Sequence, residues 1–192
     1  MTGLRERQRV ELRAHVDRVA LELFAERGFD SVTVEEIAAA AGISLSTLFR
    51  HVRSKEQLLV GTTRVGRAAI VSAFAARPAD EPVADALAAA ILQRTERFAH
   101  ESGTMELWRR AMAAAPSRVR RASLLDDEER GRLVELVGAR LGLDPTAHLE
   151  PGLRVRVALA AAEHAYEHWL LHESGRSLHE LTREALAQVS PA

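Results

Sequence analysis

The sequence lacks cysteine, so it can form no disulfide, thiolate metal site or catalytic thiol. Lysine occurs once, as Lys55, beside 25 arginines. Only 4% of the residues are aromatic, and no apolar run reaches the length of about 20 residues that crosses a membrane as a helix. The first residues are polar and charged, unlike a secretion signal. We therefore expect a soluble cytoplasmic protein with no membrane partner.

An excess of positive charge is also absent, since 26 Lys and Arg residues face 27 Asp and Glu residues. Even the first 60 residues contain nine basic and nine acidic side chains. Because nucleic-acid-binding domains are often strongly basic, any DNA affinity must come from cations placed locally. A basic N-terminal segment predicts either a flexible arm along a DNA backbone or merely a solvated terminus; its arginines are Arg5, Arg7, Arg9 and Arg13.

Signals for strands and for enzymes are missing as well. No alternating β-branched run and no Asn-Gly turn occurs. The chain lacks the phosphate-binding loop, the dinucleotide-binding glycine pattern, the nucleophile elbow and the His-Glu-x-x-His zinc motif. Ser, His and Asp are present, but nothing arranges them as a triad. We therefore predict no enzymatic activity and no cofactor.

Apolar residues recur at helical spacing, and Pro and Gly separate the segments. This pattern predicts an all-α protein of about nine helices. Residues 1–60 would form an N-terminal three-helix bundle with a helix-turn-helix, followed by a larger helical domain over residues 61–192. The predicted helices are 9–27, about 33–42, 45–51, 54–76, 82–100, 104–114, 117–141, 151–173 and 177–189.

Residues 32–59 contain the signals of the helix-turn-helix. Thr33 followed by Glu36 is a capping box, in which each side chain accepts a hydrogen bond from the backbone N–H of the other residue. Gly42 supplies the left-handed conformation that a sharp turn requires, and Ser44 can cap a second short helix. Two short helices joined by a tight turn with glycine form a helix-turn-helix.

The second helix of this motif is unusually polar. Only Leu48 and Val52 are obvious core residues, and between Ser44 and Lys55 there are three Arg and Lys side chains and no acid. Two capped helices in any α-helical protein could produce the same pattern, but a purely structural pair has no reason to keep its second helix polar. Hydroxyls flanked by cations favour a helix that contacts base edges and phosphates. Because hydroxyls bind several bases, this face does not define the sequence that is read.

The segment AxxxGISLSTLFRHVRSKEQLL resembles the DNA-binding signature of TetR-type transcriptional regulators. Two positions depart from it: Phe49 stands where Tyr is frequent, so a phosphate bond from a phenol is missing, and Val52 replaces an aromatic residue. The resemblance implies binding to double-stranded operator DNA. It assigns phosphate contacts at helix starts to Thr33 and Lys55, major-groove contacts to Ser44, Leu45, Ser46 and Thr47, and backbone contacts to Phe49, Arg50 and His51.

The resemblance also implies that the later helices bind a small-molecule effector. The short aromatic recognition segment and the Ala-rich late helix further resemble the actinobacterial subgroup that includes mycofactocin-associated regulators. We expect a repressor released by a small apolar or aromatic ligand; the alternatives are a helical protein-interaction module and a DNA-binding protein without a ligand. Aromatic and soft side chains would form either the ligand-binding wall or an ordinary core: Phe98, Met105, Trp108, Met112, Tyr166 and Trp169.

A stripe of apolar and small residues on the last two helices predicts a homodimer, unless the same stripe is buried inside one chain. Its members are Leu153, Val157, Ala160, Ala161, His164, His168 and Leu171, then Leu178, Leu181, Ala185 and Leu186. His164, His168 and His172 share one helical face at a spacing that can chelate a transition metal. Because no cysteine is available, we predict no metal site and expect these rings to line a pocket or interface or to face solvent.

Overall fold

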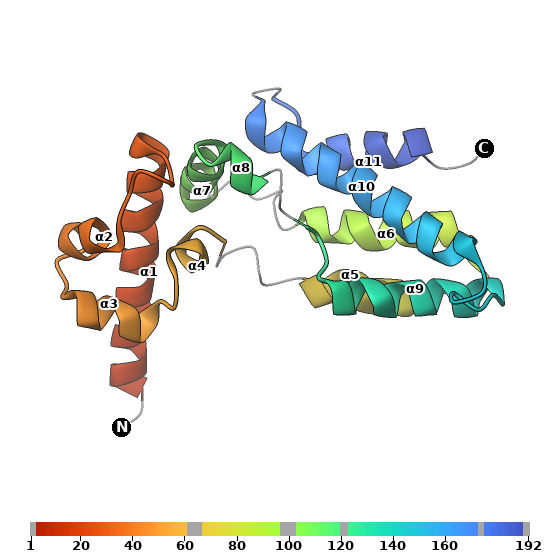
Figure 1. Cartoon of the computed structure of the whole chain (residues 1–192), viewed down its shortest axis with the longest axis horizontal. Helices are drawn as coiled ribbons and strands as arrows, with labels where there is room; N and C mark the ends of the chain where they lie inside the picture. Colours follow the sequence, from red (N-terminus) through yellow and green to blue (C-terminus); the bar gives the residue numbers. More distant parts are fainter. Residues whose placement is uncertain (1–2, 61–66, 97–102, 120–122, 173–174, 190–192) are drawn as a thin grey trace. The chain divides into compact units, whose positions relative to one another are not determined.

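The computed structural model describes residues 3–60, 67–96, 103–119, 123–172 and 175–189. Within these ranges it contains eleven helices and no strand, which confirms the predicted all-α fold (Figure 1). No helix in the described part of the chain is long and apolar enough to span a bilayer. The helices are α1 (Gly3–Arg27), α2 (Val34–Ala40), α3 (Leu45–His51), α4 (Lys55–Val60), α5 (Arg67–Ala75), α6 (Val83–Thr95), α7 (Gly103–Ala113), α8 (Pro116–Val119), α9 (Asp127–Leu141), α10 (Leu149–Leu171) and α11 (Leu178–Val189).

Contacts within the chain divide it into two compact units. The first comprises residues 1–65 and 101–120, and therefore holds α7 and α8 together with α1 to α4. The second comprises residues 66–100 and 121–192, and holds α5, α6 and α9 to α11. Two helices from the middle of the chain thus belong to the same unit as the helix-turn-helix, and α7 packs against α1 and α4. The functional boundary near residue 60 stays a prediction.

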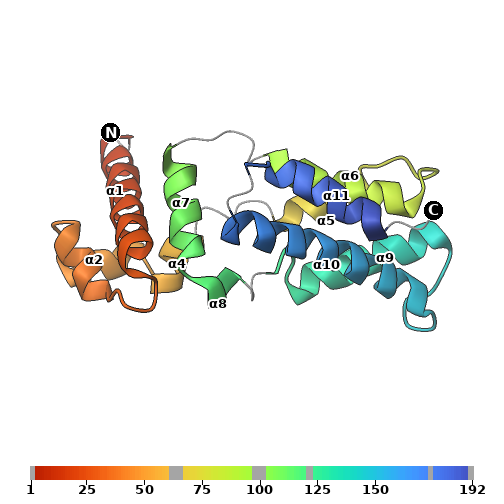
Figure 2. The same ribbon diagram turned by 90° about the horizontal axis from the view of Figure 1, so that it is seen from above.

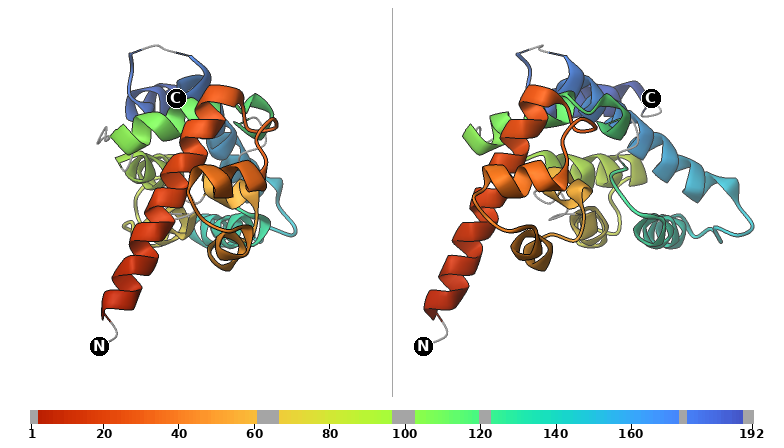
Figure 3. Two further views of the ribbon diagram at one scale, coloured as in Figure 1. Left: turned by 90° about the vertical axis from the view of Figure 1, so that its left-hand side faces the viewer. Right: turned by 60° about the vertical axis from the view of Figure 1, so that its left-hand side comes forward.

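The first unit is built around α1, which packs against α2, α4 and α7 (Figure 3). Its apolar face buries Phe24 completely, and the ring of Phe24 lies 5.0 Å from the ring of Phe29 just beyond the helix. Trp108 of α7 is buried too, and its indole Nε1 donates a hydrogen bond of 2.9 Å to the carbonyl of Leu59 in α4. The core of this unit therefore holds α4 against α7 as well as against α1.

In the second unit, α10 packs against α6, α9 and α11, and α5 packs against α6 and α9 (Figure 2). The core between them consists of aliphatic side chains and Phe74. The Glu163 carboxylate on α10 accepts hydrogen bonds from Ser123 Oγ and Leu124 N, both at 3.0 Å. This carboxylate holds the segment that precedes α9 against α10.

The prediction of one helix over 117–141 is wrong. Residues 123–126 are not helical, and they separate α8 from α9. Asp126 begins α9 with a capping box: its Oδ1 accepts from Glu129 N at 2.9 Å, and Glu129 Oε2 accepts from Asp126 N at 3.2 Å. A capping box satisfies backbone groups at a helix start, so α9 begins here and the predicted long helix is interrupted before it.

Two further helices differ from their predicted bounds. Helix α1 begins at Gly3, so the N-terminal basic segment is helical; of its two predicted forms, the flexible arm is wrong, and its arginines Arg7 and Arg9 are exposed, as a solvated terminus would be. Arg9 pairs with Glu6 at 3.0 Å, a spacing of three residues that stabilises a helix. In place of one helix over 54–76 the structure has α4 and α5, and the residues that join them lie outside the described ranges. These divisions account for eleven helices instead of about nine.

Gly138 of α9 lets the chain after the helix fold back closely against it. A Cβ atom here would lie 2.6 Å from Pro145 Cγ and 2.8 Å from Leu143 O. We expect Gly138→Ala to lower the free energy of unfolding in urea by about 1–3 kcal/mol, because neighbouring atoms must shift. Gly131→Ala on the same helix is the control, since a Cβ there meets nothing within 4 Å. Equal responses from the two variants would contradict this account.

Candidate DNA-binding site

The capping box and the glycine turn predicted for the helix-turn-helix are both confirmed. Thr33 Oγ1 accepts from Glu36 N at 3.2 Å, and Glu36 Oε2 accepts from Thr33 N at 2.8 Å. The Thr33 N–H, followed by the Arg27 guanidinium, lowers the pKa of Glu36 to about 2. Gly42 has a φ of 67°, which lets the chain turn sharply from α2 into α3. The orientation of α3 is therefore fixed by local bonds on its N-terminal side.

Helix α3 presents a connected row of polar groups. Ser44 caps the helix by accepting from Thr47 N at 3.2 Å, and its hydroxyl lies 2.9 Å from Thr47 Oγ1. Arg50 Nη2 donates to Thr47 Oγ1 at 3.2 Å. On the opposite side Leu48 is completely buried. One side of α3 thus anchors the helix, while the other offers hydroxyls and a guanidinium for an external partner.

The nine side chains predicted to contact DNA differ in how accessible they are. Thr33, Ser44, Ser46, Phe49 and Arg50 are exposed, and Leu45, Thr47, His51 and Lys55 are half-buried. Phe49 is 53% exposed. Seven of the nine therefore gather around α3, from its cap at Ser44 to its end at His51.

The Lys55 side chain has a structural role that the sequence did not indicate. Its ammonium group donates to Phe29 O and to Val32 O, each at 2.8 Å, and lies 4.3 Å from the centre of the Phe29 ring. Two of its three N–H donors are thus used inside the protein. Lys55 fastens the start of α4 to the segment between α1 and α2.

A second cation, Arg118 of α8, also packs on Phe29. Its guanidinium carbon lies 4.8 Å from the centre of the Phe29 ring, and its Nη2 lies 3.3 Å from the carboxylate of Glu56 in α4. Sequence reasoning missed both Arg118 and Phe29, because neither belongs to the motif. Together with the bond from Trp108 to Leu59 O, these contacts hold α4 between the helix-turn-helix and α7 with α8.

Comparison with known proteins agrees with this geometry. Residues 18–62 match the family described as bacterial regulatory proteins of the tetR family, and residues 81–192 match the MftR C-terminal domain. The chain belongs to the TetR family. It is a helix-turn-helix transcriptional regulator, as its sequence predicted, and the resemblance to mycofactocin-associated regulators is confirmed as well.

Among the relatives of this TetR-family chain is TcmR of Streptomyces glaucescens, which is 32% identical over 88% of this chain and 77% of its own length. The transcriptional regulator MftR of Mycobacterium tuberculosis is 31% identical over 83% of this chain and 80% of its own length. The crystal structure of NalD from Pseudomonas aeruginosa is similar in fold, with a TM-score of 0.60 at 17% identity over 94% of each chain.

The six residues predicted to bind a ligand in this TetR-family protein fall into both units. Trp108 and Met112 are buried in the first unit, where Met105 is half-buried on the same helix. Tyr166 and Trp169 are buried on α10 of the second unit, with ring centres 6.4 Å apart. Phe98 lies outside the described residues. The structure thus shows core packing on each side, and a ligand wall made from the whole set stays a prediction.

The three histidines at four-residue spacing are not gathered into a metal-binding group. His168 and His172 stack with ring centres 4.4 Å apart. His172 Nδ1 lies 3.2 Å from the backbone oxygen of His168. Across the described ranges, no three His, Asp or Glu side chains are placed to hold a metal ion. The stacked rings of His168 and His172 instead lie at the C-terminal end of α10.

Lys55→Ala removes the ammonium that binds two carbonyls. We expect the free energy of unfolding in urea to fall by about 1.5–3 kcal/mol, the usual range for hydrogen bonds to a charged group. Arg53→Ala is the matched control, because Arg53 is an exposed neighbouring cation and such changes stay within about 0.5 kcal/mol. Unchanged stability of Lys55→Ala would contradict the structural role of this side chain.

Proposed function

We propose that this regulator is a repressor that binds a palindromic operator as a homodimer and is released by a small apolar or aromatic molecule. The exposed row of hydroxyls and guanidinium on α3 is the observation that carries the DNA-binding part. NalD, which shares the fold, is described as a repressor of a multidrug efflux pump. A cytoplasmic location and the absence of enzymatic activity belong to the same proposal.

Residues 1–60 would bind DNA, and residues 61–192 would bind the ligand and form the dimer. Ser44, Ser46 and Thr47 would contact base edges in the major groove, because they project from the N-terminal turn of α3. Arg50 and His51, with Thr33 at the start of α2, would contact phosphates and fix the register of the helix. The exposed Phe49 ring would contribute apolar contact in place of a phenol.

The homodimer follows from the geometry of DNA reading. One helix-turn-helix reads one half-site, and two half-sites lie about 34–36 Å apart or a multiple of that distance. Of the predicted stripe, Leu178, Leu181 and Leu186 are buried within the unit, so they support the fold. Leu153 and Val157 on α10 are 50% and 36% exposed and are available to a second copy.

A groove of about 390 Å³ runs between α10 and α11. Small side chains at Ala161, Ala165 and Ala185 let another helix approach its floor closely. His164 and His168 line the same groove, where Arg176, just before α11, pairs with Glu184 of α11 at 2.6 Å. This mixture of small, apolar and paired polar groups suits a four-helix interface with two-fold symmetry.

Arg50→Ala should weaken binding to all DNA sequences alike. Loss of one phosphate contact flattens the dependence of log K on log salt by about one unit of slope. Thr47→Ala should instead change the ranking of operator variants, and Thr47→Ser is its control because it keeps the hydroxyl that accepts from Arg50. Gel shifts with genomic fragments at several salt concentrations measure both effects. Uniform retention of every fragment by the wild type would remove the proposal of specific binding.

Ala161→Glu places a charge in the middle of the groove between α10 and α11. We expect the wild type to sediment as a dimer at micromolar concentration and the variant as a monomer with lower operator affinity, because burying an unpaired carboxylate is costly. Ala139→Glu, on the exposed side of α9, is the control and should remain dimeric. A monomeric wild type would favour burial of the stripe within a single chain.

A further inference from the structure

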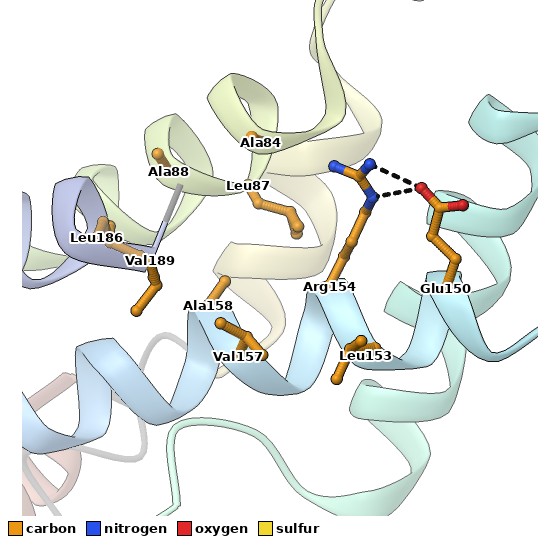
Figure 4. A pocket seen from close by; sticks show the side chains of 10 residues that line it. All are labelled: Ala84, Leu87, Ala88, Glu150, Leu153, Arg154, Val157, Ala158, Leu186 and Val189. Carbon is orange, nitrogen blue, oxygen red and sulfur yellow. Dashed lines mark hydrogen bonds and ion pairs between the residues drawn. The ribbon is translucent and has the colours of Figure 1, made fainter. Parts of the chain in front are cut away.

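The second unit contains an apolar pocket of about 280 Å³ that none of the predicted ligand-binding residues lines. It lies where α6, α10 and α11 meet (Figure 4). Its volume is close to the lower end of the range for small-molecule sites, about 300–1,000 Å³. Its apolar lining consists of Ala84, Leu87, Ala88, Leu153, Val157, Ala158, Leu186 and Val189.

The two polar residues of the pocket, Glu150 and Arg154, form an ion pair one helical turn apart at one end of it (Figure 4). Arg154 uses Nε and Nη2 on the same carboxylate oxygen, at 2.8 and 2.7 Å. Its third nitrogen, Nη1, makes no hydrogen bond within the described residues and points away from Glu150, on the side of Ala84 and Leu87. A cationic donor group thus remains available beside an apolar cavity.

We propose that this pocket binds a compact anion with an apolar body, of the aromatic carboxylate or sulfonate class. The anionic group would bind Arg154, whose planar fork matches two oxygens. The apolar body would pack on Leu87 and Ala158 inside the pocket.

Glu150 does not prevent this binding. Its side chain is 48% exposed and that of Arg154 is 35% exposed, so the ion pair is a surface pair of adjacent helical turns. Such pairs contribute little to stability. The carboxylate of Glu150 can therefore turn into solvent when a ligand anion takes its place on Arg154.

The position of the pocket connects it to regulation, and this part rests on the proposed repressor function. Val189 lines both this pocket and the groove proposed for the second copy. Val157 is likewise shared between the pocket and the exposed dimer stripe. A ligand seated here would shift α10 against α11 and so alter the pairing of the two copies, on which the spacing of their two α3 helices depends. Release requires that the ligand prefer the arrangement that does not fit the operator.

Calorimetry on the full-length protein, without DNA, tests the site. The probes are benzoate, 1-naphthoate and naphthalene-2-sulfonate, with 1-naphthalenemethanol and 1-naphthylmethylammonium as neutral and cationic controls. We expect at least one anion to bind, and Arg154→Gln to weaken it about tenfold while leaving the neutral alcohol unchanged. Ala88→Phe should abolish binding of anion and alcohol alike by filling the pocket, whereas Ala139→Phe on α9 should have no effect.

Several results would overturn the site. They are no binding of any anion, equal binding to Arg154→Gln, preference for the cation, and binding to the monomeric Ala161→Glu variant alone. The last result would mean that the second copy covers the mouth of the pocket in the dimer. Gel shifts test release from the operator separately. If an anion binds in an Arg154-dependent manner but leaves operator affinity unchanged, the site is retained and release through it is rejected. Failure of the wild type to bind any operator rejects the repressor instead.

Discussion

The ammonium group of Lys55 binds two main-chain carbonyls, Phe29 O and Val32 O, and the placement of α4 depends on this contact. Helix α4 begins only three residues after α3, the second helix of the helix-turn-helix. A shift of the start of α4 therefore moves α3 as well. Arg118 and Trp108 hold the same short helix from α8 and α7. A six-residue helix has little stability of its own. Its position is therefore set by its neighbours, and a change in α7 or α8 would reach the DNA-binding surface through it.

Helix α10 has a comparable place in the second unit. One side of it contributes Val155 and Leu159 to the core, and Glu163 binds the segment before α9. Its other side carries the exposed Leu153 and Val157, which we assign to the second copy and which also line the apolar pocket. The fold and the proposed dimer and ligand sites would thus share one helix. A ligand that moves α10 by a small amount would be felt at the interface, because packed helices slide as units and do not deform locally.

Much of the helix-turn-helix was predictable, because its signals are local. Thr33 with Glu36, the turn at Gly42 and the cap at Ser44 each act within a few residues, and the structure has all three. The bonds of Lys55 were not predictable, since their acceptors are carbonyls 23 and 26 residues away that any residue type could supply. The break before α9 combines both kinds of cause. Its capping box, Asp126 with Glu129, is a local signal that the prediction of one helix over 117–141 overlooked, and the anchoring carboxylate of Glu163 comes from 39 and 40 residues further along.

Lys55 is the only lysine in the chain, and so it carries the only side-chain amine. In acylation the nitrogen lone pair attacks the acyl carbon of the reagent or acetyl donor, whereas this nitrogen is held between two carbonyls and an aromatic ring. Acetylation here would remove the charge and leave one N–H donor in place of three, so the two bonds to carbonyls could not both persist. It would therefore proceed only in molecules whose α4 has already separated from the α1–α2 segment. Acylation located at Lys55 itself would thus report how often that junction opens.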